Sequence, residues 1–255
     1  MIECLNEDHV MAVQPTLLLI ADIAGYTRFM KMHYMSLMHA QDIVARLLEA
    51  IIDAAEPQLK LAKLEGDAAF FYLPFRTERG TPPDIVAQQA AVIYRAFHAR
   101  IADLRTNNMC LCDGCTQAGN LKIKLVGHVG DVAVHKVKQM TELAGIDVIL
   151  VHRLLKNDVP VPEYLLMTHA MYEHVGASMR DRASPLDVEL DDLGTTSTFY
   201  VNLAQYVQEV PAAARLSLMA RINRHLKQNF RAIPYIVGLK KACADFRNVA
   251  DGAIN

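Results

Sequence analysis

Two aspartates stand where an acid is costly unless it meets a positive charge. Asp22 ends the apolar run TLLLIA, and Asp67 lies in the turn of the segment LKLAKLEGDAAFFYLPF. A buried carboxylate needs such a partner. If the two strands are neighbours, both carboxylates meet at one sheet edge, where their oxygens suit Mg²⁺ or Mn²⁺. The alternative is that Asp22 only caps a turn and Asp67 is an ordinary hairpin residue.

The residues behind Asp22 have the types that approach phosphate. Gly25 allows the backbone to come close to a ligand. Thr27 and its neighbouring amides can open a helix N-terminus, which favours phosphate oxygens. We therefore interpret Asp22 as a metal ligand and the residues after it as a cradle for a polyphosphate.

A cysteine-rich loop is a second candidate site. The loop at residues 107–120 carries Cys110, Cys112 and Cys115. In a reducing compartment this CxCxxC spacing indicates a soft metal, first of all Zn²⁺, with a fourth ligand from elsewhere in the chain, for which His98 and His128 are candidates. The alternative is three thiols in a surface loop.

The bulk properties exclude several classes of protein. With 52% hydrophobic and 21% charged residues, the chain can build a core and is not disordered. No stretch reaches the roughly 18 uninterrupted apolar residues of a membrane span. The first ten residues, MIECLNEDHV, lack the basic and apolar regions of a signal peptide. We therefore expect a cytoplasmic protein whose cysteines form no disulfides.

The net charge of −2 hides an asymmetry between the two parts of the chain. Residues 206–255 carry eight Lys/Arg and three Asp/Glu, and residues 1–205 carry eighteen and twenty-five. The basic tail can meet nucleic acid, an acidic membrane or the acidic body of its own fold, and we favour the last. The expected division is a main domain at 1–205 and a basic, mostly helical extension at 206–255.

Apolar periodicity predicts the elements that position these residues. Strands are expected at 16–21, in a hairpin around Glu65-Gly66, as two strands around Gly130, and near 163–168, 186–190 and 198–203; helices are expected from Ser36, from Pro82-Pro83, over 146–157 and from Pro211 onward with a break at Pro234. This order is that of an α+β sandwich, with helices packed on one mainly antiparallel sheet.

Four segments resemble the motifs of class III nucleotidyl cyclases. LLLIADIAGYT is similar to the family's F-A-D-I-x-G-F-T motif, KLEGDAAFF to its K-x-x-G-D hairpin, VGHVGDVAV to G-I-H-T-G-E-V, and ELAGIDVILVHRLL to D-x-x-G-x-x-V-N-x-A-x-R-L. They occur in the family's order and cover residues 16–158. The segment HRLLKN and the CxCxxC loop resemble a little-characterised bacterial subgroup of cyclase-like proteins more closely than they resemble the family as a whole. The resemblance implies a ferredoxin-like, class III cyclase-type α+β sandwich.

The resemblance also implies roles for individual residues. Asp22 and Asp67, with the Ile23 carbonyl, match the Mg²⁺ or Mn²⁺ ligands; Gly25, Tyr26 and Thr27 match the triphosphate loop; Lys63 and Glu142 match the positions that select the base; and Arg153 matches the arginine that stabilises the α-phosphate. In the family the metal ligands come from one protomer, and the residues that select the base and the arginine come from the other. A homodimer is therefore expected to bind a purine nucleoside triphosphate.

One position departs from the family's pattern. Ile149 stands where the family has an asparagine that orients the ribose, and losing one such polar group typically costs about 10²–10³ in turnover. Three functions follow as alternatives. The first is an adenylate cyclase-type enzyme, acting on ATP rather than GTP. The second is a slow or silent module that binds nucleotide and metal, and the third is a zinc-stabilised scaffold.

Overall fold

The structure is a computed structural model of the chain. It describes residues 12–32, 37–56, 58–74, 85–110, 117–137, 140–207, 209–210 and 212–230. Ser36, Pro82-Pro83, Pro211 and Pro234, at which helix starts and a helix break are expected, lie outside these ranges. Within these ranges, no helix is long and apolar enough to cross a membrane.

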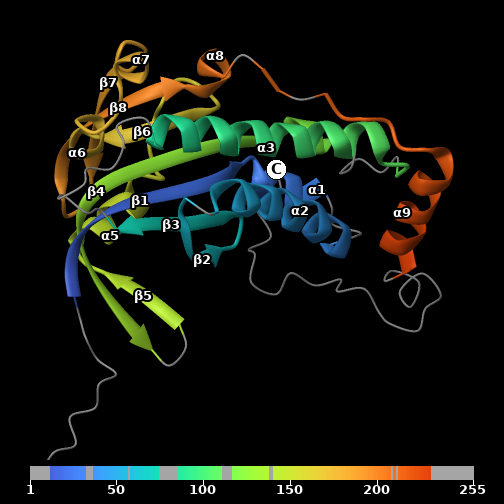
Figure 1. The fold of residues 1–255 in the computed structure, drawn as a ribbon, viewed down its shortest axis with the longest axis horizontal. Helices are drawn as coiled ribbons and strands as arrows, with labels where there is room; N and C mark the ends of the chain where they lie inside the picture. The colour runs from blue at the N-terminus through green and yellow to red at the C-terminus, as the bar shows by residue number, and fades with distance from the viewer. Residues whose placement is uncertain are drawn as a thin grey trace, which may run out of the picture.

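A single twisted sheet of eight strands organises the described part of the chain (Figure 1). Its strands are β1 (Ala12–Ala24), β2 (Lys60–Glu65), β3 (Ala68–Pro74), β4 (Lys122–Val137), β5 (Met140–Ala144), β6 (Tyr164–Thr168), β7 (Ser184–Leu190) and β8 (Gly194–Asn202). The strand order is β2-β3-β1-β4-β6-β8-β7, and β5 pairs with β4. Among these pairs β4 and β6 run parallel and the others antiparallel, which confirms the expected α+β sandwich.

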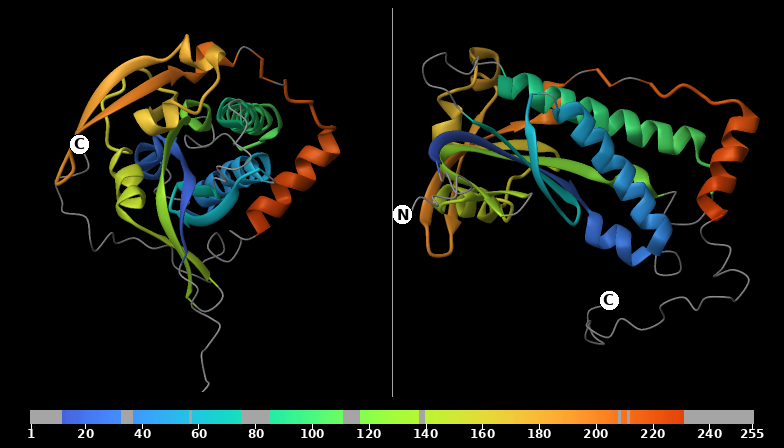
Figure 2. Two further views of the ribbon diagram at one scale, coloured as in Figure 1. Left: turned by 60° about the vertical axis from the view of Figure 1, so that its left-hand side comes forward. Right: turned by 60° about the horizontal axis from the view of Figure 1, so that its bottom comes forward.

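Helices cover both faces of the sheet (Figure 2). They are α1 (Tyr26–Met32), α2 (Leu37–Ala55), α3 (Ile85–Asn107), η1 (Ala118–Asn120), α5 (Ile146–Arg153), α6 (His169–Tyr172), α7 (Ala177–Arg180), α8 (Leu203–Tyr206) and α9 (Leu218–Phe230). The long helices α2 and α3 lie on one face, and α5 lies on the other. The apolar stripe predicted for the second long helix is buried along α3, at Val86, Ala90, Ile93, Phe97, Ile101 and Leu104.

Strand β1 reads as a continuous apolar run because both of its faces are covered. Leu17 and Leu19 belong to the core under α2 and α3, whereas Leu18 and Ile20 pack in the core under α5. Side chains alternate between the two faces of a strand. Asp22 therefore falls on the α5 face, at the end of the apolar row.

The two strands predicted around Gly130 are one continuous strand, so that prediction was wrong. β4 runs unbroken through Gly130 and pairs with β1 on one side. The glycine is required for a close approach instead of a turn. A Cβ at this position would lie 2.3 Å from Cγ of Asp147 and 2.5 Å from Nε2 of His128, which no side chain tolerates without displacing one of them.

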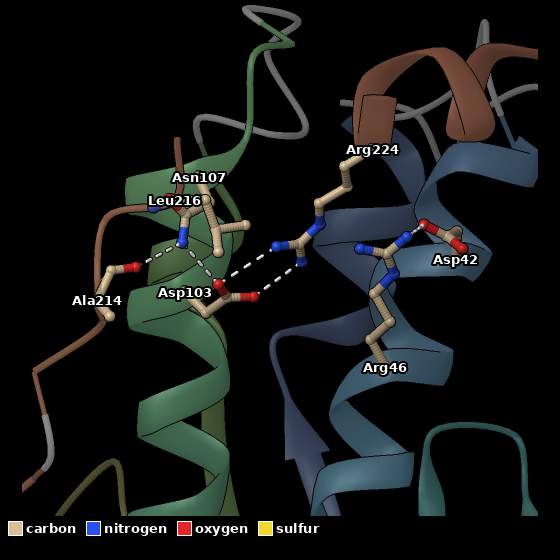
Figure 3. A network of polar contacts seen from close by, with 7 residues as sticks. All are labelled: Asp42, Arg46, Asp103, Asn107, Ala214, Leu216 and Arg224. Carbon is tan, nitrogen blue, oxygen red and sulfur yellow. Dashed lines mark hydrogen bonds and ion pairs between the residues drawn. The ribbon is translucent and has the colours of Figure 1, made fainter. Parts of the chain in front are cut away.

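The basic C-terminal extension is attached to the C-terminal part of α3, at Asp103 and Asn107 (Figure 3). Arg224 on α9 makes two contacts with the Asp103 carboxylate, of 3.2 Å and 2.8 Å. The Leu216 amide donates to Asn107, whose own side-chain amide donates to the Ala214 carbonyl. At Arg224, the positive charge of the extension meets an acid of its own fold, as the charge asymmetry predicts.

Candidate active site

The structure brings Asp22 and Asp67 together at one edge of the sheet. Asp22 is the last residue of β1 that pairs with β3, where it lies opposite Ala68, the first residue of β3. Asp67 lies in the tight β2–β3 turn, where Gly66 adopts a φ of +68° that favours glycine. The Ile23 amide donates to the Asp67 carbonyl over 3.2 Å. The two carboxylates therefore come from neighbouring backbone positions, although they are distant in the chain.

The electrostatics of this pair favour a cation. Burial, and then the nearby Asp67 carboxylate, raise the pKa of Asp22 to about 6, against the opposing effect of Lys124. Burial also raises the pKa of Asp67. Two ionised carboxylates in such a place repel each other unless a positive charge joins them.

The donor set suits an ion that keeps other ligands. In the described ranges, no group of three or more His, Cys, Asp or Glu side chains is placed to hold an ion. Mg²⁺ is usually held by one or two carboxylates together with waters and substrate phosphates. Asp22, Asp67 and a backbone carbonyl such as that of Ile23 fit this pattern, whereas a closed structural metal site would need more side chains.

The loop after Asp22 turns sharply into a helix. Gly25 has a φ of +88°, and its carbonyl accepts the Phe29 amide at the start of α1. Tyr26 and Thr27 are the first residues of α1, so their amides have no partner within the helix. Thr27 is exposed, and the Tyr26 hydroxyl accepts a hydrogen bond from Gln41. First-turn amides without a partner in the helix are the groups that the predicted phosphate cradle requires.

A pocket of about 400 Å³ collects three of the other predicted residues. It is lined by Lys63, Val148, Ile149, His152, Arg153, Lys156, Glu189, Leu190 and Asp191. Lys63, Ile149 and Arg153 are thus brought together from β2 and α5. Asp22, Asp67 and Glu142 are not among the lining residues. Glu142 lies on β5, opposite His135 of β4.

Two cationic groups of the pocket, Arg153 and Lys63, already have acidic or carbonyl partners. The Arg153 guanidinium donates to the Asp191 carbonyl over 2.9 Å and lies 3.4 Å from the Asp192 carboxylate. Lys63 forms an ion pair of 2.8 Å with Glu65. Ile149 is 48% exposed and offers no hydrogen-bonding group to this wall of the pocket.

Sequence reasoning missed Lys124, which lies beside Asp22 at the acidic edge, the sheet edge formed by Asp22 and Asp67. It lies opposite Asp22 in the β1–β4 register and opposite Tyr164 in the β4–β6 register. Its ammonium lies 5.9 Å from the centre of the Tyr164 ring. Within LKIKLVGH the alternation marks Lys124 as a strand residue, but only the register between strands places it beside Asp22.

The cysteine loop falls largely outside the described residues. Cys112 and Cys115 are outside the described residues, whereas Cys110 is described and is partly buried beside the core under α2 and α3. The zinc site remains a prediction. Elemental analysis of the purified protein should find stoichiometric zinc, and a metal-free result would contradict it.

The two histidines considered as fourth zinc ligands make other contacts. Both ring nitrogens of His128 are hydrogen-bonded, Nδ1 to Thr168 over 2.8 Å and Nε2 to Asp147 over 3.0 Å. Nε2 of His98 lies 2.7 Å from the Glu163 carboxylate. His128 therefore has no nitrogen left for a metal, and His98 would have to use its other nitrogen.

The fold is that of the catalytic domains of class III nucleotidyl cyclases. The chain matches the adenylyl cyclase CyaB of Pseudomonas aeruginosa with a TM-score of 0.52 and 14% identity, over 81% of this chain and 99% of that chain. It also matches a class III adenylyl cyclase-like ATP-binding protein from the same organism with a TM-score of 0.53 and 15% identity, over 68% of this chain and 37% of that one. At such identities the likeness concerns the fold.

The chain belongs to the family of the uncharacterised protein Rv2561/Rv2562 of Mycobacterium tuberculosis. The two are 44% identical over 210 residues, which are 82% of this chain and 96% of the mycobacterial protein. Residues 44–164 also match the family described as "Protein of unknown function (DUF2652)".

Proposed function

We propose that this protein is a homodimeric nucleotidyl cyclase that converts a purine nucleoside triphosphate, ATP in preference to GTP, to a cyclic nucleotide and pyrophosphate. The convergence of Asp22 and Asp67 at one sheet edge carries the proposal. Both have raised pKa values, so their ionised forms are costly without a cation. A cytoplasmic protein would meet such a nucleotide as its complex with Mg²⁺.

The acidic edge would bind the reacting end of the nucleotide. Asp22 and Asp67, with the Ile23 carbonyl, would hold Mg²⁺ or Mn²⁺. When bound, the ions would lower the pKa of the ribose 3′-hydroxyl and neutralise charge on the phosphates. The first-turn amides at Tyr26 and Thr27 would contact phosphate oxygens beside Gly25.

The pocket of Lys63 and Arg153 would supply the other half of a site. Lys63 would donate to the base, with Glu142 as its partner in base selection, and Arg153 would stabilise the charge on the α-phosphate. The acidic edge does not line this pocket. Two chains related by a two-fold axis would bring each acidic edge to the partner's pocket, which creates two equivalent sites.

Ile149 predicts slow turnover. It lines the pocket and is half exposed, so its side chain would contact a nucleotide bound there. That side chain cannot hydrogen-bond to a hydroxyl group. Removing one preorganised donor or acceptor typically costs about 10²–10³ in turnover.

The test is an assay of purified protein with ATP, and separately GTP, in Mn²⁺. We expect cyclic product that is lost in Asp22→Asn and Asp67→Asn and retained in Asp53→Asn, a matched change at an exposed acid of α2. Product that survives both changes would contradict the proposal. Metal-dependent stabilisation by ATP without product would instead support a nucleotide-binding module, and no response to either nucleotide would leave only a scaffold.

A further inference from the structure

Glu65 joins the two walls of the pocket. It is the last residue of β2, and one carboxylate oxygen lies 2.8 Å from the Lys63 ammonium. The other oxygen lies 3.2 Å from Nδ1 of His152 on α5. Lys63 and His152 line the pocket, whereas Glu65 does not. The carboxylate is therefore placed behind the pocket wall, with both oxygens engaged.

The chemistry of His152 defines the direction of its contact. Burial lowers the pKa of His152, and Lys63 lowers it further, against the opposing effect of Glu65. A neutral imidazole carries one N–H, and a carboxylate can only accept. Nδ1–H of His152 therefore donates to Glu65. The ring also packs edge-on against Phe70, at 4.9 Å between centroids, so its position is defined by packing as well as by the hydrogen bond.

We propose that Glu65 is a positioning residue that determines base specificity through Lys63. This inference rests on the proposed nucleotide site. A lysine side chain has four rotatable bonds, and holding it in one conformation costs entropy. Glu65 is held from the opposite side by His152, so it offers Lys63 one fixed acceptor and reduces that cost before a ligand binds.

The contact leaves Lys63 with donors for a base edge. An ammonium group has three donors, and Glu65 uses one of them. The others are available to an acceptor such as N1 of adenine. Each Glu65 oxygen already contacts Lys63 or His152, and Glu65 does not line the pocket, so its carboxylate is not presented to N1–H and N2–H of guanine. The arrangement therefore favours ATP over GTP.

The experiment compares dissociation constants for ATP and GTP, measured calorimetrically in Mg²⁺, across single and double variants. Glu65→Gln should reduce the preference for ATP about fivefold, because a fivefold ratio of dissociation constants corresponds to the free energy of about one partly exposed ion pair. Lys63→Met should reduce it at least as much. Glu65→Gln should have no further effect on the preference in the Lys63→Met background, because Glu65 acts through Lys63. Glu49→Gln, at an exposed acid of α2, should bind like the wild type.

The outcomes separate this inference from the proposed function. If the wild type binds neither nucleotide, both are overturned. If it binds and Glu65→Gln keeps the wild-type preference, only the role of Glu65 is overturned. An equal effect of Glu65→Gln with and without Lys63 would also overturn it. Thermal unfolding of each variant checks that a lost preference does not come from a lost fold.

Discussion

Asp22 is a residue whose ionisation the fold resists. Its pKa is about 6 in the folded chain, against an ordinary value of 3.8. The folded state therefore keeps a proton that the unfolded chain releases between these pH values, and stability falls as the pH rises through that window. At neutral pH the folded protein carries an ionised carboxylate at a net cost, which a bound cation would remove.

The first prediction follows from the loss of stability that ionised Asp22 causes above about pH 6. Asp22→Asn should stabilise the metal-free protein by about 1–2 kcal/mol at pH 7.5, a value discounted for partial exposure, and should have little effect at pH 4. Thermal unfolding at both pH values measures the difference, with Asp53→Asn as the control. Mn²⁺ should raise the melting temperature of the wild type at pH 7.5 and not that of Asp22→Asn. Equal stabilisation of both by Mn²⁺ would contradict the assignment of Asp22 as a ligand.

The second prediction concerns the residue at which the chain departs from the cyclase pattern. Ile149→Asn would restore a hydrogen-bonding group in the pocket, so it should raise cyclase turnover about tenfold or more. Because Ile149 is 48% exposed, stability should change by less than about 1 kcal/mol. Ile146→Asn is the matched control, since Ile146 is exposed on the same helix but does not line the pocket. Equal effects of the two substitutions on turnover would contradict a specific role for position 149.

At the scale of elements, α5 is held against the sheet by a partly buried chain of polar contacts. Asp147, in its first turn, accepts from the Asp131 amide over 2.8 Å and lies 3.0 Å from Nε2 of His128. Nδ1 of His128 contacts Thr168 on β6. The missing side chain at Gly130 provides the space for these groups. The contacts determine where α5 presents Arg153.

The third prediction tests this anchor. Asp147→Ala leaves the buried His128 ring without one partner, which should reduce the free energy of unfolding by about 2 kcal/mol. Gly130→Ala should also destabilise the protein, because its Cβ would collide with the same groups. Urea denaturation measures both changes. Asp158→Ala, at an exposed acid beyond α5, should have little effect, and equal stability of Asp147→Ala and this control would show that the anchor contributes nothing.

At the scale of the whole molecule, the two proposed halves of a site do not share one pocket within one chain. Asp22 and Asp67 occupy one sheet edge, and Arg153 lies in a pocket that they do not line. A symmetric pair of chains would use each half twice.

The fourth prediction follows from that symmetry. Asp22→Asn and Arg153→Ala should each abolish cyclase activity in a pure preparation. After mixing and exchange of subunits, heterodimers would carry one intact site, so activity should return to about a quarter of the wild type if the chains pair at random. Light scattering confirms the dimer in each preparation. A mixture that stays inactive although heterodimers have formed would contradict a site shared between chains.

The local pattern of the sequence was sufficient for several of the elements and faces. The β2–β3 hairpin, the buried stripe of α3 and the start of α5 after Gly145 agree with the structure. Alternation along β1 places Asp22 in line with Leu18 and Ile20. These features depend on neighbours within a few residues, and the spacing of side chains along a strand or helix determines them directly.

Contacts between distant segments were decided only by the tertiary structure. The register of three strands placed Lys124 beside Asp22, and the packing of α5 on the sheet placed His152 against Glu65. Likewise, Gly130 suggested a turn by its residue type and proved to be a point of close approach inside a strand. The sequence by itself therefore determined which side chains share a face, because that follows from backbone periodicity. Which faces meet, and in which register, was decided by packing across the whole sheet, since no local pattern specifies it.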